Sequence, residues 1–294
     1  MNGIRAIWTL LALDAVAIFV TYWRLPPVQT YHVSLSGFDG GASRVVVFLC
    51  FPAALAAIAI LGLVFERLHG RWAKRVALTA FLLCASVVWP GVVDQANLDV
   101  KWSNAFAAAG VLIVVVLSFL ARPPAQPPVP SRAGDRARLA LGAVAVLLAV
   151  EWIAAELGFF LDGVPVLGSI FITGKIARVA GGGIAPAVHH GHHHGLDGLL
   201  LSLTALVLSR ELGTVPGRRL RALLGAYLAL MLVYGLTNMV NDAWDEQVFK
   251  RGWTNWLVPG LLNPSASFAW AAMLVAAALI YAAFFARGPL LRRR

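Results

Sequence analysis

Long apolar stretches dominate this chain of 294 residues and constrain its fold more than any other feature. A helix needs about 20 mostly apolar residues to cross the hydrocarbon core of a bilayer. Because 60% of the residues are hydrophobic and 13% are charged, the sequence predicts an all-α, polytopic transmembrane helix bundle in a single integral-membrane domain, residues 1–294. About eight spans are expected, near residues 6–23, 45–65, 76–93, 104–121, 139–160, 190–210, 220–240 and 266–286.

Two of these stretches leave the number of spans open. The third is short, and the sixth reaches spanning length only when its histidines are included, so seven spans is the alternative. A proline-rich segment at 122–138 is predicted to be a cytoplasmic linker. It separates four N-terminal spans (1–121) from four C-terminal spans (139–294), which carry the candidate site.

The basic residues predict the orientation of the bundle. Of the 24 lysines and arginines, 17 lie at the N-terminus, in the C-terminal tail, or in the loops near 67–75, 122–138 and 210–221. Lys and Arg are enriched in cytoplasmic loops, so both termini are predicted to be cytoplasmic. Arginine also greatly outnumbers lysine and alanine is abundant, which indicates a bacterial source and therefore the bacterial plasma (inner) membrane.

The net charge of +10 is explained by these loops and does not indicate nucleic-acid binding. No basic stripe is interleaved with aromatic residues in a polar domain, so no nucleic acid is expected as a partner. Membrane lipids are expected, because the basic tails lie near anionic headgroups. The sequence does not identify protein partners.

Five of the seven histidines lie between His189 and Asp197, at the start of the sixth stretch. On a helix they would divide between two sides, with His192 facing away from the others. Imidazole and carboxylate groups bind zinc, so the sequence predicts a divalent metal site, with zinc favoured. The alternative is an interfacial segment that hydrogen-bonds without metal. The predicted ligands share an arc of roughly 100° and are His190, His193, His194 and Asp197.

Small residues accompany these histidines. Gly191, Gly195 and Gly198 would form a neighbouring stripe on the same helix, and such a stripe allows another helix to pack closely.

Three acidic residues fall inside predicted spans. Glu151 and Glu156 lie five residues apart on the fifth span and diverge by about 140° around a helix, so each is considered separately. A buried carboxyl has a raised pKa, which suits a general base or a proton carrier, so both are candidate catalytic residues. Glu156 could also simply reach the interface, and Glu151 could serve packing alone. Asp14 is a lone acid midway along the first span.

A third polar group lies at the outer end of the seventh span. Asn238, Asp242 and Asp245 would share one helical face, where they could complete a metal site or contact a polar substrate. The alternative is an acidic helix edge that faces water.

Three short motifs resemble parts of known families, each over only a few residues. His190-x-x-His193-His194 resembles a histidine box of membrane fatty-acid desaturases and hydroxylases, and His190-x-x-x-His194 is similar to the zinc-binding helix of ceramidase-like membrane hydrolases. Asn241-Asp242-x-x-Asp245 resembles the magnesium-diphosphate motif of UbiA-type prenyltransferases. No function is transferred from these likenesses.

The sequence therefore favours a metal-dependent membrane enzyme whose site lies in the outer half of the bundle and faces the extracytoplasmic side. A bound metal lowers the pKa of its water, and Glu151 or Glu156 would act as base or acid. Such a depth suits hydrolysis or group transfer on a lipid or lipid-linked substrate. Two other functions stay open: a transporter or translocator of metal ions or protons, and a metal-stabilised sensor or assembly subunit without catalysis.

Overall fold

The computed structural model describes residues 2–94, 97–123, 134–179, 182–258 and 260–285. Within these ranges the chain is mostly helical, which confirms the all-α prediction. One short antiparallel ladder is present in the described chain, between β1 (Ile176–Arg178) and β2 (Ile184–Pro186), with Ala177 opposite Ala185. Most of the predicted proline-rich linker, residues 124–133, lies outside the described residues.

The helices follow the predicted apolar stretches along the chain. In order, the α-helices are α1 (Asn2–Arg24), α2 (Gly37–Cys50), α3 (Ala53–Val64), α4 (Gly70–Ala85), α5 (Trp102–Leu120), α6 (Asp135–Leu148), α7 (Val150–Glu156), α8 (Leu167–Ile170), α9 (His194–Ser209), α10 (Arg218–Ala243) and α11 (Phe268–Ile280). Short 3-10 or π-helical segments are η1 (Pro27–Gln29), η2 (Phe65–Arg67), η3 (Ser86–Val88), η4 (Glu211–Thr214), η5 (Trp244–Phe249) and η6 (Tyr281–Phe285).

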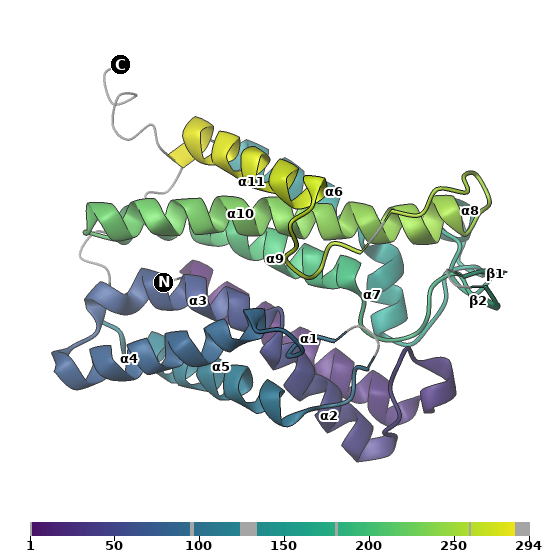
Figure 1. Cartoon of the computed structure of the whole chain (residues 1–294), viewed down its shortest axis with the longest axis horizontal. Helices are drawn as coiled ribbons and strands as arrows, with labels where there is room; N and C mark the ends of the chain where they lie inside the picture. Colours follow the sequence, from purple (N-terminus) through teal and green to yellow (C-terminus); the bar gives the residue numbers. More distant parts are fainter. Residues whose placement is uncertain (1, 95–96, 124–133, 180–181, 259, 286–294) are drawn as a thin grey trace.

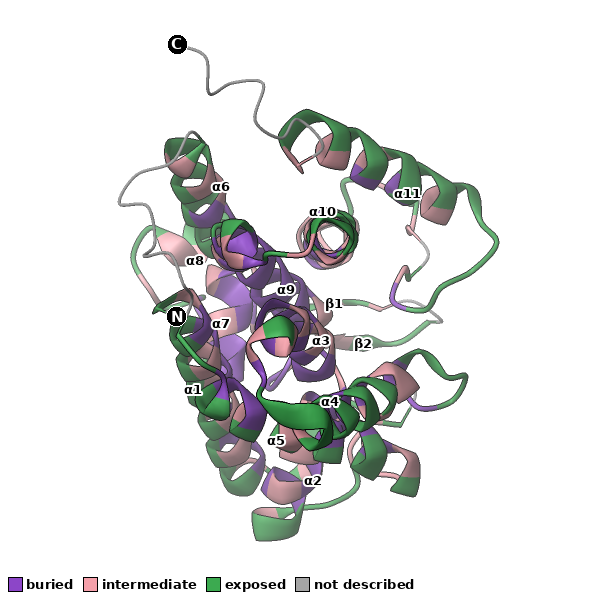
Figure 2. Cartoon of the chain, turned by 90° about the vertical axis from the view of Figure 1, so that its left-hand side faces the viewer, coloured by how far each residue is buried: buried purple, intermediate pink, exposed green. Residues whose placement is uncertain are grey.

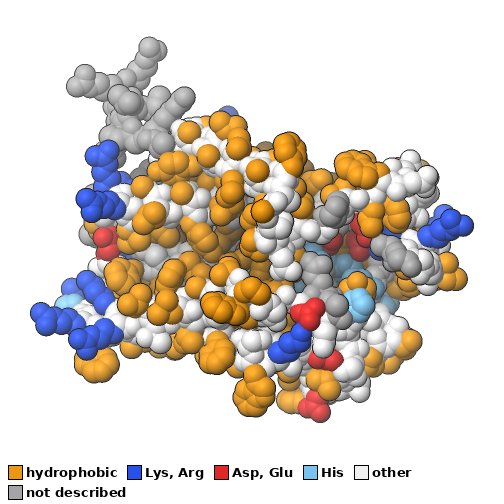
Figure 3. Space-filling view, viewed as in Figure 1, with side chains coloured by type: hydrophobic (Ala, Val, Ile, Leu, Met, Phe, Trp, Pro, Cys, Tyr) orange, Lys and Arg blue, Asp and Glu red, His pale blue; other side chains and the backbone are white. Residues whose placement is uncertain are grey.

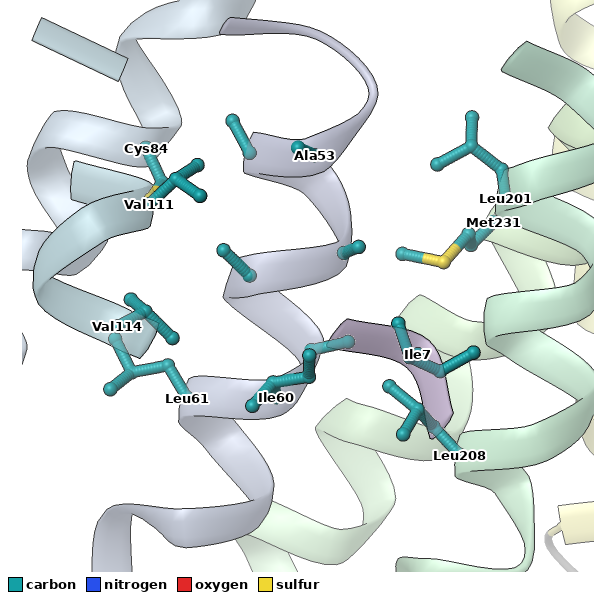
Figure 4. Packing of buried hydrophobic residues seen from close by; sticks show 14 of the residues in the cluster. Ile7, Ala53, Ile60, Leu61, Cys84, Val111, Val114, Leu201, Leu208 and Met231 are labelled. Atoms are coloured by element: carbon teal, nitrogen blue, oxygen red, sulfur yellow. The ribbon is translucent and has the colours of Figure 1, made fainter. Parts of the chain in front are cut away.

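The helices form two groups that meet along α3 and α9. Figure 1 shows α10 lying across the molecule with α9 beside it, while α1 to α5 form the lower part of the view. Helix α3 packs against α5 and α4 on one side and contacts α9 and α10 on the other. Figure 4 shows this packing, with Ile60 and Leu61 of α3 between Val114 of α5 and Leu208 of α9. The main apolar core therefore lies in the middle of the bundle and reaches the histidine loop at Tyr22 and Phe48.

Apolar side chains also cover much of the outside. In Figure 2, α6 and α11 are largely exposed, whereas α9 and α3 are buried in the centre. Large apolar residues stand out from the helices at positions such as Leu112, Leu147 and Leu279. An exposed apolar belt of this kind needs a hydrocarbon environment rather than water. The fold therefore points to a membrane protein.

The number of helices able to cross a membrane is smaller than the sequence suggested. In the part of the chain that the structure describes, four are long and apolar enough by themselves, namely α1, α5, α10 with η5, and α11 with η6. Two further pairs qualify if each is one bent span: α2 with α3 and η2, bent by 44°, and α6 with α7, bent by 56°. The two remaining stretches form α4 and α9, of 16 residues each. The structure thus supports four to six candidate spans, and eight are not confirmed.

Glycine allows α9 to approach its neighbours closely, as predicted for Gly195 and Gly198, whereas Gly191, the third residue of the predicted stripe, precedes the helix. A Cβ added at Gly235 of α10 would lie 2.6 Å from the carbonyl oxygen of Gly198, and one at Gly198 would collide with the carbonyl of Gly235. At Gly195 the indole ring of Trp152 in α7 occupies the same space. These contacts fix α9 between α7 and α10.

The prediction of one histidine-bearing helical face is wrong. Helix α9 begins only at His194, so His190, His192 and His193 precede it. Gly191 has a φ of +100°, a conformation that side-chain-bearing residues rarely adopt. His193 is extended, with φ −118° and ψ 153°. Neighbouring side chains in extended backbone point to opposite sides, so the histidines divide between two places.

Backbone hydrogen bonds hold this histidine loop against two helices. The N–H of Gly191 donates to the carbonyl oxygen of Ala155 in α7, at 2.9 Å. The N–H of His192 donates to the hydroxyl of Tyr22 in α1, at 3.2 Å. The loop is therefore positioned by α1 and α7 before α9 begins.

Candidate metal centre

The histidine loop, the start of α9 and the end of α10 line a cavity of about 550 Å³. Figure 3 shows acidic and histidine side chains gathered in a recess toward the right of the view, whereas Lys and Arg side chains are prominent at the left end. Apolar residues such as Phe51 and Leu261 complete part of the wall. The polar residues of interest in the wall are His189, His192, His193, His194, Asp197, Asn238, Asp242, Asp245 and Glu246.

The first group of candidate ligands, called the cavity group below, consists of His189, His193 and Glu246. One ligand atom from each residue lies within 4.8 Å of the others. The His193 Nδ1 atom is 3.4 Å from a carboxylate oxygen of Glu246. The rings of His189 and His193 stack with their centroids 3.9 Å apart. Two imidazoles and one carboxylate with room beside them match the three-ligand sets of catalytic zinc sites.

Hydrogen bonds outside the cavity group orient its ligands. The His193 Nε2 atom lies 2.8 Å from the backbone oxygen of His189, which can only accept, so Nε2 carries the proton. In neutral His193 the lone pair is then on Nδ1, which faces Glu246. The indole N–H of Trp152 donates to the second carboxylate oxygen of Glu246, at 2.6 Å. Metal-binding histidines usually have such a partner on their other nitrogen.

The second group, called the buried group below, surrounds His192. Its Nδ1 atom is 3.1 Å from a carboxylate oxygen of Glu156 and 3.9 Å from one of Asp14, and its Nε2 atom is 2.6 Å from a carboxylate oxygen of Asp197. The edge of the Phe48 ring packs against the imidazole. Three carboxyl groups thus converge on one imidazole, and Glu156 and His192 are both almost fully buried.

Burial and neighbouring charge shift the pKa values of these loop histidines in different directions. Burial alone would lower the pKa of His192, but the Asp197 and Glu156 carboxylates raise it well above its ordinary value. For His193, burial is outweighed by Glu246, and the pKa is raised. Burial and the adjacent His193 lower the pKa of His189 well below its ordinary value, so His189 is neutral and its lone pair is available.

Most of the metal and substrate residues predicted from the sequence lie in the cavity wall. His193, His194 and Asp197 are there, together with three residues from α10 and η5. Asp242 also accepts a hydrogen bond from the N–H of Gly195, at 2.5 Å, so it holds the first turn of α9. Asn238 and Asp242 belong to α10, and Asp245 belongs to η5, which follows it.

The other three predicted residues are not among the described residues of the cavity wall. His190 stacks on the ring of Phe160, with centroids 3.9 Å apart. Glu151 is completely buried and accepts a hydrogen bond from the side-chain amide of Gln247. Glu156 contacts His192 instead. The structure therefore separates Glu151 from Glu156, in keeping with their divergence around the helix.

Sequence reasoning missed residues that the structure makes central. A helical interpretation of the loop predicts that His192 faces away from the ligands, and the loop is not helical at His192. His189 and His193 are four residues apart, and Glu246 follows Asp242 by four. Both spacings are patterns from which these residues could have been identified in the sequence. Arg44 was also missed, and it lies in the cavity wall although its side chain is buried.

Comparisons with protein-family models, with curated proteins and with solved structures find no match to this chain. Its function is therefore argued from the geometry of the site.

Proposed function

We propose that the chain is a multi-pass membrane enzyme that uses a divalent metal ion, with zinc favoured, to hydrolyse or transfer a group on a lipid or lipid-linked substrate. The observation that carries this proposal is the cavity group, whose three ligand atoms converge within 4.8 Å at the wall of a cavity. The hydrogen bonds on the far sides of His193 and Glu246 direct His193 Nδ1 and a Glu246 carboxylate oxygen toward each other, where a metal would take the place of their mutual contact. Three protein ligands leave a position for water or substrate.

The chemistry then follows from what a metal does to bound water. Coordination lowers the pKa of that water toward neutrality and so supplies a nucleophile. His194 is placed to exchange a proton, because its side chain is one-third exposed in the cavity wall. Its Nδ1 atom lies 3.6 Å from a carboxylate oxygen of Asp197, which would orient the ring. This arrangement assigns the acid–base role to His194 rather than to Glu151 or Glu156.

Basic residues in the same wall favour a substrate with an anionic group. Lys101 and Lys250 are each paired with a neighbouring aspartate. Arg44 differs, because no ion pair joins it to a carboxylate among the described residues and its Nε atom has no hydrogen-bond partner there. Its guanidinium donates to the carbonyl of Leu98 and packs over the ring of Tyr22. A buried arginine with free donors is suited to bind a phosphate or carboxylate.

The proposal includes a topology. The eight apolar segments would cross or enter the bacterial inner membrane, with both termini cytoplasmic and the site at the extracytoplasmic side. Support comes from the charge distribution, since α4 and α10 begin with basic residues at the end of the bundle opposite the cavity. Lys and Arg favour the cytoplasmic side of a membrane.

Metal removal tests the proposed activity. The purified chain, reconstituted in vesicles that contain lipids with anionic headgroups, should release product from those lipids, and a chelator should abolish release. Added Zn²⁺ should restore it, because the nucleophilic water depends on the metal. Hydrolysis or transfer that continues after the metal has been removed and its absence confirmed by elemental analysis would contradict the proposal.

A substitution at Arg44 tests the class of substrate. Arg44→Gln should lower kcat/KM by about 10- to 100-fold for an anionic lipid, because a hydrogen bond to a charged group is lost. For an uncharged lipid of the same chain length the change should be small. Arg219→Gln, at an exposed position near the start of α10, is the matched control. Equal losses for charged and uncharged lipids would refute the role of Arg44.

A further inference from the structure

The buried group has features of a second binding site that the proposed activity does not use. Its ligands come from three distant parts of the chain: Asp14 from the middle of α1, Glu156 from the end of α7, and His192 from the loop before α9. Of these, only His192 belongs to the described wall of the cavity. One ligand atom from each lies within 4.8 Å of the others.

The proton on His192 can be placed in only two ways while the ring is neutral. If Nε2 carries it, Nε2 donates to Asp197 at 2.6 Å, and the lone pair on Nδ1 faces the carboxylates of Glu156 and Asp14. If Nδ1 carries it, the lone pair on Nε2 faces a carboxylate oxygen of Asp197 at 2.6 Å. The repulsion is then stronger, because this distance is shorter than the distance from Nδ1 to Glu156. A neutral ring therefore turns a lone pair toward a carboxylate on one side, and a positive charge there, either a second ring proton or a metal cation, removes this repulsion.

Charge balance leads to the same requirement. Three carboxyl groups surround the ring, and among the described residues only histidines form ion pairs with them. Burying carboxylates without enough opposite charge is unfavourable. A second ring proton on His192 would offset one negative charge, whereas a divalent cation would offset two.

Two carboxyl oxygens of the buried group lack a hydrogen-bond partner among the described residues. The Glu156 side chain is 3% exposed and the Asp14 side chain 10% exposed. Glu156 Oε1 and Asp14 Oδ2 have no hydrogen-bond partner among the described residues. Buried acceptors are rarely left without a partner in folded proteins. A cation would satisfy both, with Asp197 holding the ring in the required tautomer.

We propose that Asp14, Glu156 and His192 form a second divalent-cation site, distinct from the cavity group, that ties α1 to α7 and to the loop before α9. Carboxylate and imidazole ligands suit Zn²⁺ and Mn²⁺. Structural metal sites surround the ion with protein ligands, while catalytic sites keep an open position. This site does not depend on the proposed activity.

Counting bound Zn²⁺ tests the second site. The full-length chain in detergent is stripped of metal, dialysed against Zn²⁺ and subjected to elemental analysis. We expect two equivalents in the wild type and one in the double variant Asp14→Asn, Glu156→Gln, whose side chains keep the same shape. Glu151→Gln is the matched control, because this buried carboxyl belongs to neither group, and it should keep two.

The outcomes separate the two proposals. One equivalent in the wild type that the double variant retains would overturn the second site and leave the cavity group standing. If the wild type binds one equivalent, and the double variant loses it while His193→Ala retains it, the result would support the second site and refute the proposed catalytic metal. If the double variant fails to fold, His193→Ala decides, because it removes a ligand of the cavity group only: one equivalent bound to it would support the second site, and none would overturn it.

Discussion

A chain carrying His193→Ala should lose one metal equivalent and all measurable activity. His193 supplies one of three ligands in the cavity group, and its removal also leaves Glu246 buried without its closest cationic or metal partner. Changing residues that only orient a ligand weakens metal affinity by about 10- to 100-fold, so losing the ligand itself should cost at least about 100-fold. Elemental analysis and a lipid-hydrolysis assay on the same preparation measure both effects.

The control for this variant is His69→Ala. His69 is an exposed histidine at the start of α4, among the basic residues opposite the cavity. It should leave metal content and rate unchanged. A His193→Ala chain that keeps its metal but loses activity would show that His193 has another role. One that keeps both would refute the cavity group as the catalytic centre.

Gly198→Val should destabilise the bundle by about 3 kcal/mol or more. The added side chain would meet the backbone carbonyl of Gly235 and the backbone nitrogen of Met239, which cannot rotate away. Overpacking a close contact usually costs about 1–3 kcal/mol, and more when the backbone must move. Because Asp197 lies on α9 and Glu246 on η5, which continues α10, the variant should also weaken metal binding. Unfolding in detergent by heat or denaturant measures the loss.

Gly142→Ala in α6 is the comparison. A Cβ there would lie 3.5 Å from a methyl of Leu203, which is ordinary contact, and alanine also favours a helix by about 1 kcal/mol over glycine. This variant should be neutral or slightly more stable. Similar losses in Gly198→Val and Gly142→Ala would contradict a tight crossing of α9 and α10.

The positions of the helices could be predicted from hydropathy, but which of them span could not. Length and apolarity located α1, α5 and α10 closely, because each presents apolar residues to lipid. Helix α9 does not follow that rule, since 13 of its 16 residues are buried inside the bundle. A helix surrounded by protein has no hydrocarbon thickness to match, so its length says little about crossing.

The sequence indicated which segments form the site, but it did not indicate how their side chains are arranged. The histidine segment and the acidic end of α10 were both identified, and the structure brings them to one cavity. The error arose at Gly191, whose positive φ is incompatible with a helix. The histidines before α9 are therefore not helical, and His192 and His193 point to different sides. A helical wheel cannot show such a break. Nor could the sequence reveal that Asp14, over 140 residues away, lies beside Glu156.

Helix α11 contributes nothing to the described wall of the cavity, which ends at Leu262, and both metal groups are complete by Glu246. Membrane chains are made and inserted from the N-terminus, so every ligand is already synthesised before α11 leaves the ribosome. The centre can therefore assemble while translation is still under way. Damage to the last helix would then affect retention and lifetime in the bilayer, with the reacting groups left in place.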